Sequence, residues 1–75
     1  MEIRLKINDS FIEDLKEQTG ISSTTQLTTE AFTLLKWAIS ESAKGRVILS
    51  ENQDGTDEKE VVMPTLLNAK SLAAR

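Results

Sequence analysis

The sequence contains no cysteine and no histidine among its 75 residues. Disulfides are therefore excluded, and so are the usual thiolate and imidazole ligand sets for zinc, haem ligation by histidine and iron–sulfur clusters. A cysteine nucleophile and a histidine-based catalytic triad are excluded for the same reason. We expect a protein that is not an enzyme and that holds neither a metal ion nor a cofactor.

Residues that break regular structure are also scarce, with three glycines and one proline in the chain. One small domain is all that this length accommodates. Below roughly 70–80 residues, a single hydrophobic core rarely supplies more than about 3–5 kcal/mol of stability. Because disulfides and the common metal sites are excluded, association with a second subunit is the leading route to a stable fold.

Long hydrophobic runs are absent too, since apolar residues occur at most three in a row. A membrane-spanning helix needs about 18 such residues, and the N-terminus lacks the pattern of a signal peptide. We expect a cytoplasmic protein with no membrane partner.

The first clear pattern is a strict alternation of polar and apolar residues over 2–7. This period predicts a β-strand with one buried face. Its apolar face consists of Ile3, Leu5 and Ile7, and its polar face of Glu2, Arg4 and Lys6. A lone strand is not stable, so it needs a partner from either a later hairpin of this chain or the same strand of a second chain.

A short acidic helix is predicted next, over residues 9–19, with Asp9 or Ser10 as its N-terminal cap. Gly20 suits the left-handed position that commonly ends a helix. A longer helix follows over about 24–44, where Ser23 and Gln26 have the spacing of a capping box and Ser22 is a competing cap.

The apolar arc of this second helix is unusually wide. Its central stripe contains Leu27, Ala31, Leu34, Leu35 and Ala38. Phe32, Trp37 and Ile39 widen the arc to roughly 220° at 100° per residue. A surface helix needs little more than about 100°, so a second copy of the chain is a natural cover for the excess.

The remaining residues predict a β-hairpin over 46–63, with turn chemistry at 52–55 and a loop extending as far as Lys59. Pro64 ends the hairpin, and 64–75 is expected to be a flexible tail with a faint helical pattern in Leu66, Leu67 and Leu72. The fold class is thus α+β, with a core over 1–45, the hairpin and the tail.

The order of strand, short acidic helix, Gly-Ile-Ser turn and long apolar helix resembles the ribbon-helix-helix family over about residues 2–40. The matching features are the alternation over 2–7, the helix start at Asp9 and Ser10, the turn Gly20-Ile21-Ser22, and Leu27, Ala31, Leu34 and Leu35.

This resemblance implies a homodimer in which two chains pair their strands into an antiparallel β-ribbon and interlock their helices. Its implied core residues are Ile3, Leu5, Ile7, Leu27, Ala31, Leu34, Leu35, Trp37 and Ala38. The resemblance also implies a transcriptional repressor of bacterial or phage type that binds double-stranded DNA. Glu2, Arg4 and Lys6 would face the bases of the major groove. Residues Ser22, Ser23, Thr24 and Thr25 would position a phosphate through backbone amides at the helix start.

Two alternatives remain open from the sequence. The first is an antitoxin-like or adaptor module that uses its acidic hairpin and tail to bind another protein. The second is a monomer in which residues 1–8 join the hairpin in one three-stranded sheet.

The net charge of −3 is unevenly distributed. Residues 1–8 carry +1 and residues 64–75 carry +2, whereas 9–19 and 46–63 each carry −3 and 20–45 are neutral. In a ribbon dimer, the basic groups Arg4 and Lys6 of both chains would share one face. We therefore expect modest and strongly salt-dependent DNA binding.

Overall fold

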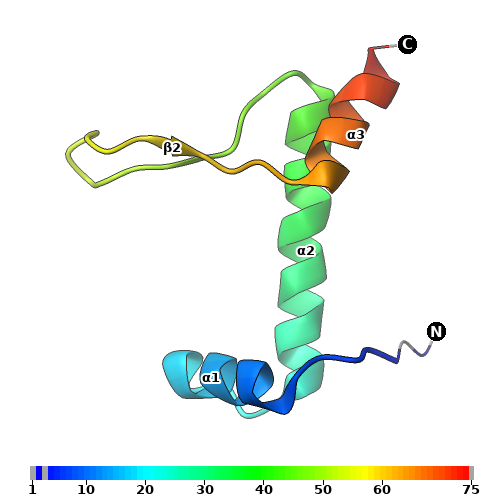
Figure 1. Cartoon of the computed structure of the whole chain (residues 1–75), viewed down its shortest axis with the longest axis vertical. Helices are drawn as coiled ribbons and strands as arrows, with labels where there is room; N and C mark the ends of the chain where they lie inside the picture. The colour runs from blue at the N-terminus through cyan, green and yellow to red at the C-terminus, as the bar shows by residue number, and fades with distance from the viewer. Residues whose placement is uncertain (1, 3, 75) are drawn as a thin grey trace. The chain divides into compact units, whose positions relative to one another are not determined.

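The computed structural model describes residue 2 and residues 4–74. The described elements are α1 (Asp9–Thr19), α2 (Thr24–Ala43), β1 (Leu49–Ser50), β2 (Lys59–Glu60) and α3 (Pro64–Ala73) (Figure 1). The predicted α+β class is confirmed, with three helices and one antiparallel pair of strands in the described part. The chain divides into two compact units, Met1–Ala31 and Phe32–Arg75.

In the first unit, α1 has the predicted bounds, but its cap lies one residue before the predicted candidates. The side-chain oxygen of Asn8 accepts the backbone N–H of Ser10 at 2.9 Å and the Ser10 hydroxyl at 2.6 Å. Asn8 is therefore the cap, and the prediction of Asp9 or Ser10 is wrong. Asp9 lies instead in the first turn, where its negative charge suits the helix dipole.

The end of α1 follows the prediction. Gly20 adopts a positive φ of 71°, a conformation that a residue without Cβ adopts at little cost. Its N–H donates to the carbonyl of Lys16 at 2.9 Å, which satisfies one of the last free carbonyls of the helix.

In the second unit, the predicted hairpin is present with shorter strands than expected. Leu49 pairs with Glu60 and Ser50 with Lys59. The Val61 N–H donates to the carbonyl of Ile48 at 2.7 Å, which carries the ladder one step beyond the assigned strands. Figure 1 shows the hairpin, residues 46–63, extending as an arm away from α2 and α3.

Two interactions between Arg46 and Glu41 connect the start of the arm to α2. The backbone N–H of Arg46 donates to the Glu41 carbonyl at 3.1 Å, and Arg46 Nε lies 3.2 Å from Glu41 Oε2. The chain therefore reverses direction directly after the helix and enters the first strand of the arm.

Residues 64–73 form a helix, and the prediction of a flexible tail over 64–75 is wrong for them. Pro64 occupies the first turn of α3, a position that needs no backbone N–H. Leu66 is 5% exposed, and the other buried residues of the described chain, Ala38 and Ser42, lie near the end of α2. Burial of Leu66 beside α2 favours order in this segment, a tertiary effect that the faint helical pattern did not indicate.

None of the helices in the described residues is long and apolar enough to cross a membrane.

Candidate nucleic-acid interface

The N-terminal segment leads into α1 without regular secondary structure at residue 2 or at residues 4–8. The strand predicted over 2–7 is thus not formed in the single chain, because within the described residues no other strand pairs with this segment. The prediction for Ile3 lies outside the described residues. Leu5 and Ile7 are 47% and 41% exposed, so the apolar face of the segment is uncovered.

The polar residues of this segment are all exposed. Arg4 and Lys6 form no ion pair with a carboxylate in the described part of the chain, unlike Lys16, Arg46 and Lys59. Two cations in one short segment therefore remain available for an external anion or base edge.

The second part of the candidate interface is the start of α2. Ser23 Oγ accepts the Gln26 N–H at 3.1 Å, and the Ser23 carbonyl accepts the Leu27 N–H at 3.1 Å. These bonds confirm Ser23, rather than Ser22, as the cap. The amides of Thr24 and Thr25 occupy the first turn, where the helix offers no backbone acceptor.

Acidic side chains lie close to this helix start. Glu13, Lys16 and Glu17 line one shallow hollow together with Ser22. Lys16 Nζ is 3.7 Å from Glu13 Oε1, so part of its charge is already neutralised. Two carboxylates against one lysine make the local field less favourable to a phosphate than a bare helix start.

The predicted dimer-core residues differ widely in exposure. Leu34 and Trp37 are 64% and 51% exposed, and Ala31 is exposed too, whereas Leu27 and Leu35 are half-buried. Ala38, at 8%, is already covered within its own chain. Most of this predicted core therefore has surface left for a partner.

None of the described side chains of the first unit is buried. Phe11 is 55% exposed, and the remaining apolar side chains of α1, Ile12 and Leu15, are half-buried. These side chains therefore retain apolar surface for a partner.

Sequence reasoning missed two local features. The first is the cap at Asn8, which the residue type itself indicates, since asparagine is among the best capping residues. The hollow formed by the hairpin, α2 and α3 was also missed, because its lining comes from segments separated along the chain, from Ser42 to Lys70. In the described residues, no three acidic side chains converge into a metal-binding group.

Comparisons of the chain with protein-family models, curated proteins and solved structures find no match.

Proposed function

We propose that this protein is a sequence-specific DNA-binding transcriptional regulator of the ribbon-helix-helix type. In this proposal, two copies pair their N-terminal segments into an antiparallel ribbon, which enters the DNA major groove. The observation that carries the proposal is the exposed N-terminal segment directly preceding two capped helices. Its Arg4 and Lys6, on alternate residues, form no ion pair with any described residue.

The homodimer accounts for the exposed apolar groups of the first unit. Leu5 and Ile7 would form the inner face of the ribbon, and Phe11 would pack beneath it. Burial of apolar surface contributes roughly 25 cal/mol per Å², so covering these side chains favours association. The backbone groups of the N-terminal segment would gain partners at the same time.

On the opposite face of the ribbon, each polar side chain has a defined partner in DNA. Arg4 and Lys6 suit the O6 and N7 acceptors of guanine, and the Glu2 carboxylate suits the N4 amino group of cytosine. This arrangement would read G·C base pairs through charge-assisted hydrogen bonds.

The start of α2 would set the position of the ribbon on the duplex. Residues Ser22 and Ser23 and the first-turn amides of Thr24 and Thr25 would approach a phosphate oxygen. Because Glu13 and Glu17 lie close by, this contact would orient the protein more than it would increase affinity.

The decisive experiment compares two double variants in fluorescence-anisotropy titrations against DNA selected from a random pool. R4A/K6A should abolish selectivity for the selected site over scrambled DNA. K36A/K59A removes the same total charge from exposed positions outside the ribbon and should retain that selectivity.

Sedimentation of both variants at micromolar concentration checks that the dimer is intact. If R4A/K6A retains wild-type selectivity, or if the wild-type chain selects no DNA sequence at all, the proposed function is wrong.

A further inference from the structure

Most of the exposed large apolar side chains in the described residues belong to the second unit. On the hairpin arm, Val47 is 53% and Val62 58% exposed, and on α3 Leu67 is 56% exposed. The proposed ribbon does not involve these residues. The arm and α3 therefore present an apolar surface that the DNA-binding proposal leaves uncovered.

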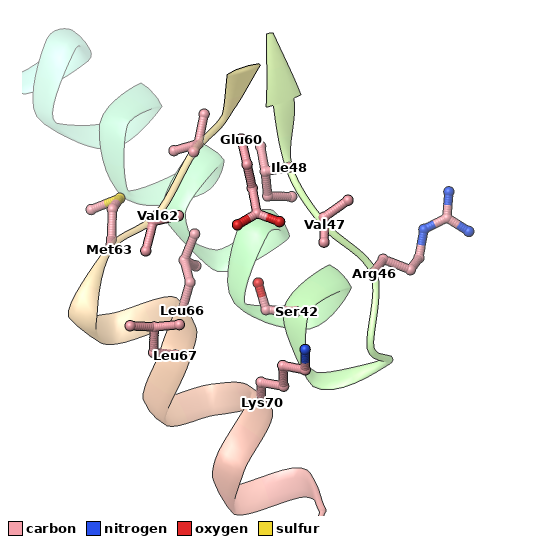
Figure 2. A pocket seen from close by; sticks show the side chains of 11 residues that line it. Ser42, Arg46, Val47, Ile48, Glu60, Val62, Met63, Leu66, Leu67 and Lys70 are labelled. Carbon is pink, nitrogen blue, oxygen red and sulfur yellow. The ribbon is translucent and has the colours of Figure 1, made fainter. Parts of the chain in front are cut away.

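Part of this surface is a hollow between the arm and α3 (Figure 2). Val47, Val62 and Leu67 line it, together with the polar groups of Glu60 and Lys70. Its volume is about 60 Å³. Small-molecule sites usually enclose about 300–1,000 Å³, so the hollow fits side chains of a protein surface better than a small ligand.

Charge is segregated along the second unit. The turn of the arm carries four carboxylates, of which Asp57 is paired with Lys59 at 3.6 Å. The four are Glu51, Asp54, Asp57 and Glu58. The base of the arm and α3 carry Lys44, Arg46 and Lys70, of which Arg46 is paired with Glu41. One further carboxylate, Glu60, lines the hollow together with Lys70, so this end keeps a small net positive charge.

A surface that is acidic at one end and basic at the other is complementary to itself. A two-fold rotation brings the acidic turn of one chain against the basic end of the other, and the second contact follows by symmetry. The apolar residues between the two ends would then face the same residues of the second copy. The charge pattern thus identifies a second copy of this chain as the partner.

The apolar surface available for this interface extends over the arm and α3. Leu49, Val61 and Met63 are 45%, 41% and 41% exposed, and Leu72 of α3 is 61% exposed. Covering these side chains would favour association.

We propose that the arm and α3, within residues 44–73, form a second self-association surface, in which the hairpin arm of one chain lies across the hollow of another copy. The acidic turn of each arm faces Lys44 and Lys70 of its partner. This interface does not depend on DNA binding. Where the ribbon is formed as well, the arms link ribbon dimers into larger assemblies, and adjacent DNA sites are occupied cooperatively.

A reciprocal charge-reversal experiment tests the interface. One variant, E51K/E58K, makes the turn of the arm positively charged. The other, K44E/K70E, makes the opposite end of the surface negatively charged. All four side chains are exposed, and none forms an ion pair or side-chain hydrogen bond with a described residue, so both variants should fold. K36E is the control, since Lys36 is exposed on the polar side of α2.

Assembly is measured by analytical ultracentrifugation of the full chain without DNA. Each variant alone should dissociate at roughly tenfold or higher concentration than wild type, because like charges then face each other. Mixing the two variants in equal amounts should restore assembly. The lysines at positions 51 and 58 of one variant then face the glutamates at positions 44 and 70 of the other. K36E should assemble as wild type does.

The proposal is overturned if both variants assemble as wild type does, or if mixing weakened variants restores nothing. It is also overturned if wild-type chains do not associate through this surface and the surface binds an unrelated protein instead. Loss of DNA selectivity in R4A/K6A with intact reciprocal rescue separates the two proposals, since the rescue reports on the arm alone.

Discussion

Ser23 and Gln26 define the start of the longest helix. The hydroxyl oxygen of Ser23 accepts the backbone N–H of Gln26 at 3.1 Å, and neighbouring Ser22 is exposed and forms no such bond. Two serines in adjacent positions thus differ in one measurable interaction.

Replacement of Ser23 by alanine should reduce the free energy of unfolding by about 1 kcal/mol, because the first turn of α2 loses its side-chain acceptor. Urea denaturation followed by circular dichroism, at fixed chain concentration, measures the change.

S22A is the matched control and should change the free energy of unfolding by less than about 0.5 kcal/mol, as is usual for exposed positions. Equal destabilisation by S22A and S23A would contradict the assignment of the cap.

The elements of this chain could be predicted where the determining interactions are local. Gly20 and Ser23 mark a helix end and a helix start, because each bond spans at most four residues. The helix over 64–73 was missed, because the burial of Leu66 involves α2 and a hairpin that lie far away in the sequence.

The residues of the candidate interface could be predicted from the sequence pattern, but the charged groups around them could not. Alternation identified Arg4 and Lys6, and the structure leaves both exposed and unpaired in the described part. Sequence spacing did not indicate that Glu13 and Glu17 share a hollow with Ser22, because that proximity depends on the turn between α1 and α2. The pairing of two N-terminal segments remains a prediction.

The acidic pair beside Ser22 leads to a prediction about affinity. E13Q/E17Q removes two negative charges and frees Lys16 from its 3.7 Å partner. DNA binding should strengthen by roughly threefold to tenfold at low salt, and the gain should disappear as salt screens the charges. Anisotropy titrations across a salt series measure both effects.

D14N provides the comparison for this variant, since Asp14 lies on the same helix but does not line the hollow with Ser22. Its effect on affinity should be less than half that of E13Q/E17Q, which removes two charges. Unchanged or weaker binding by E13Q/E17Q would exclude contact of the α2 start with a phosphate.

The turn of the arm should respond to acid through Asp54. The Thr56 hydroxyl donates to Asp54 Oδ1 at 2.5 Å and the Thr56 N–H donates at 3.0 Å, and these bonds lower the pKa of Asp54 below its ordinary value of 3.8. Because the folded-state pKa is depressed, the stabilisation of the turn is present above the ordinary value. It is lost as pH falls through the lowered pKa.

An NMR titration of the Asp54 carboxyl carbon and the Thr56 amide follows this transition. T56V removes the hydroxyl donor and should raise the pKa of Asp54 towards 3.8, whereas T65V, on α3, should leave it unchanged. Titration of Asp54 at its ordinary value in the wild-type chain would disprove the effect of Thr56.

Leu66 and Leu67 are adjacent on α3 but have different environments, at 5% and 56% exposed. L66A removes a buried side chain and should reduce the free energy of unfolding by about 2 kcal/mol, towards the low end for buried leucines because the hollow beside it already leaves packing incomplete. L67A removes an exposed side chain and should cost less than about 0.5 kcal/mol. Urea denaturation at one chain concentration, low enough to keep wild type and variants equally dissociated, measures both changes without a contribution from association.

The order of the two effects reverses when assembly is measured by ultracentrifugation, since L67A should weaken assembly while the fold is retained. Equal loss of stability in the two variants would mean that α3 does not pack on the rest of the second unit through Leu66. The surface proposed for the arm would then lack its supporting helix.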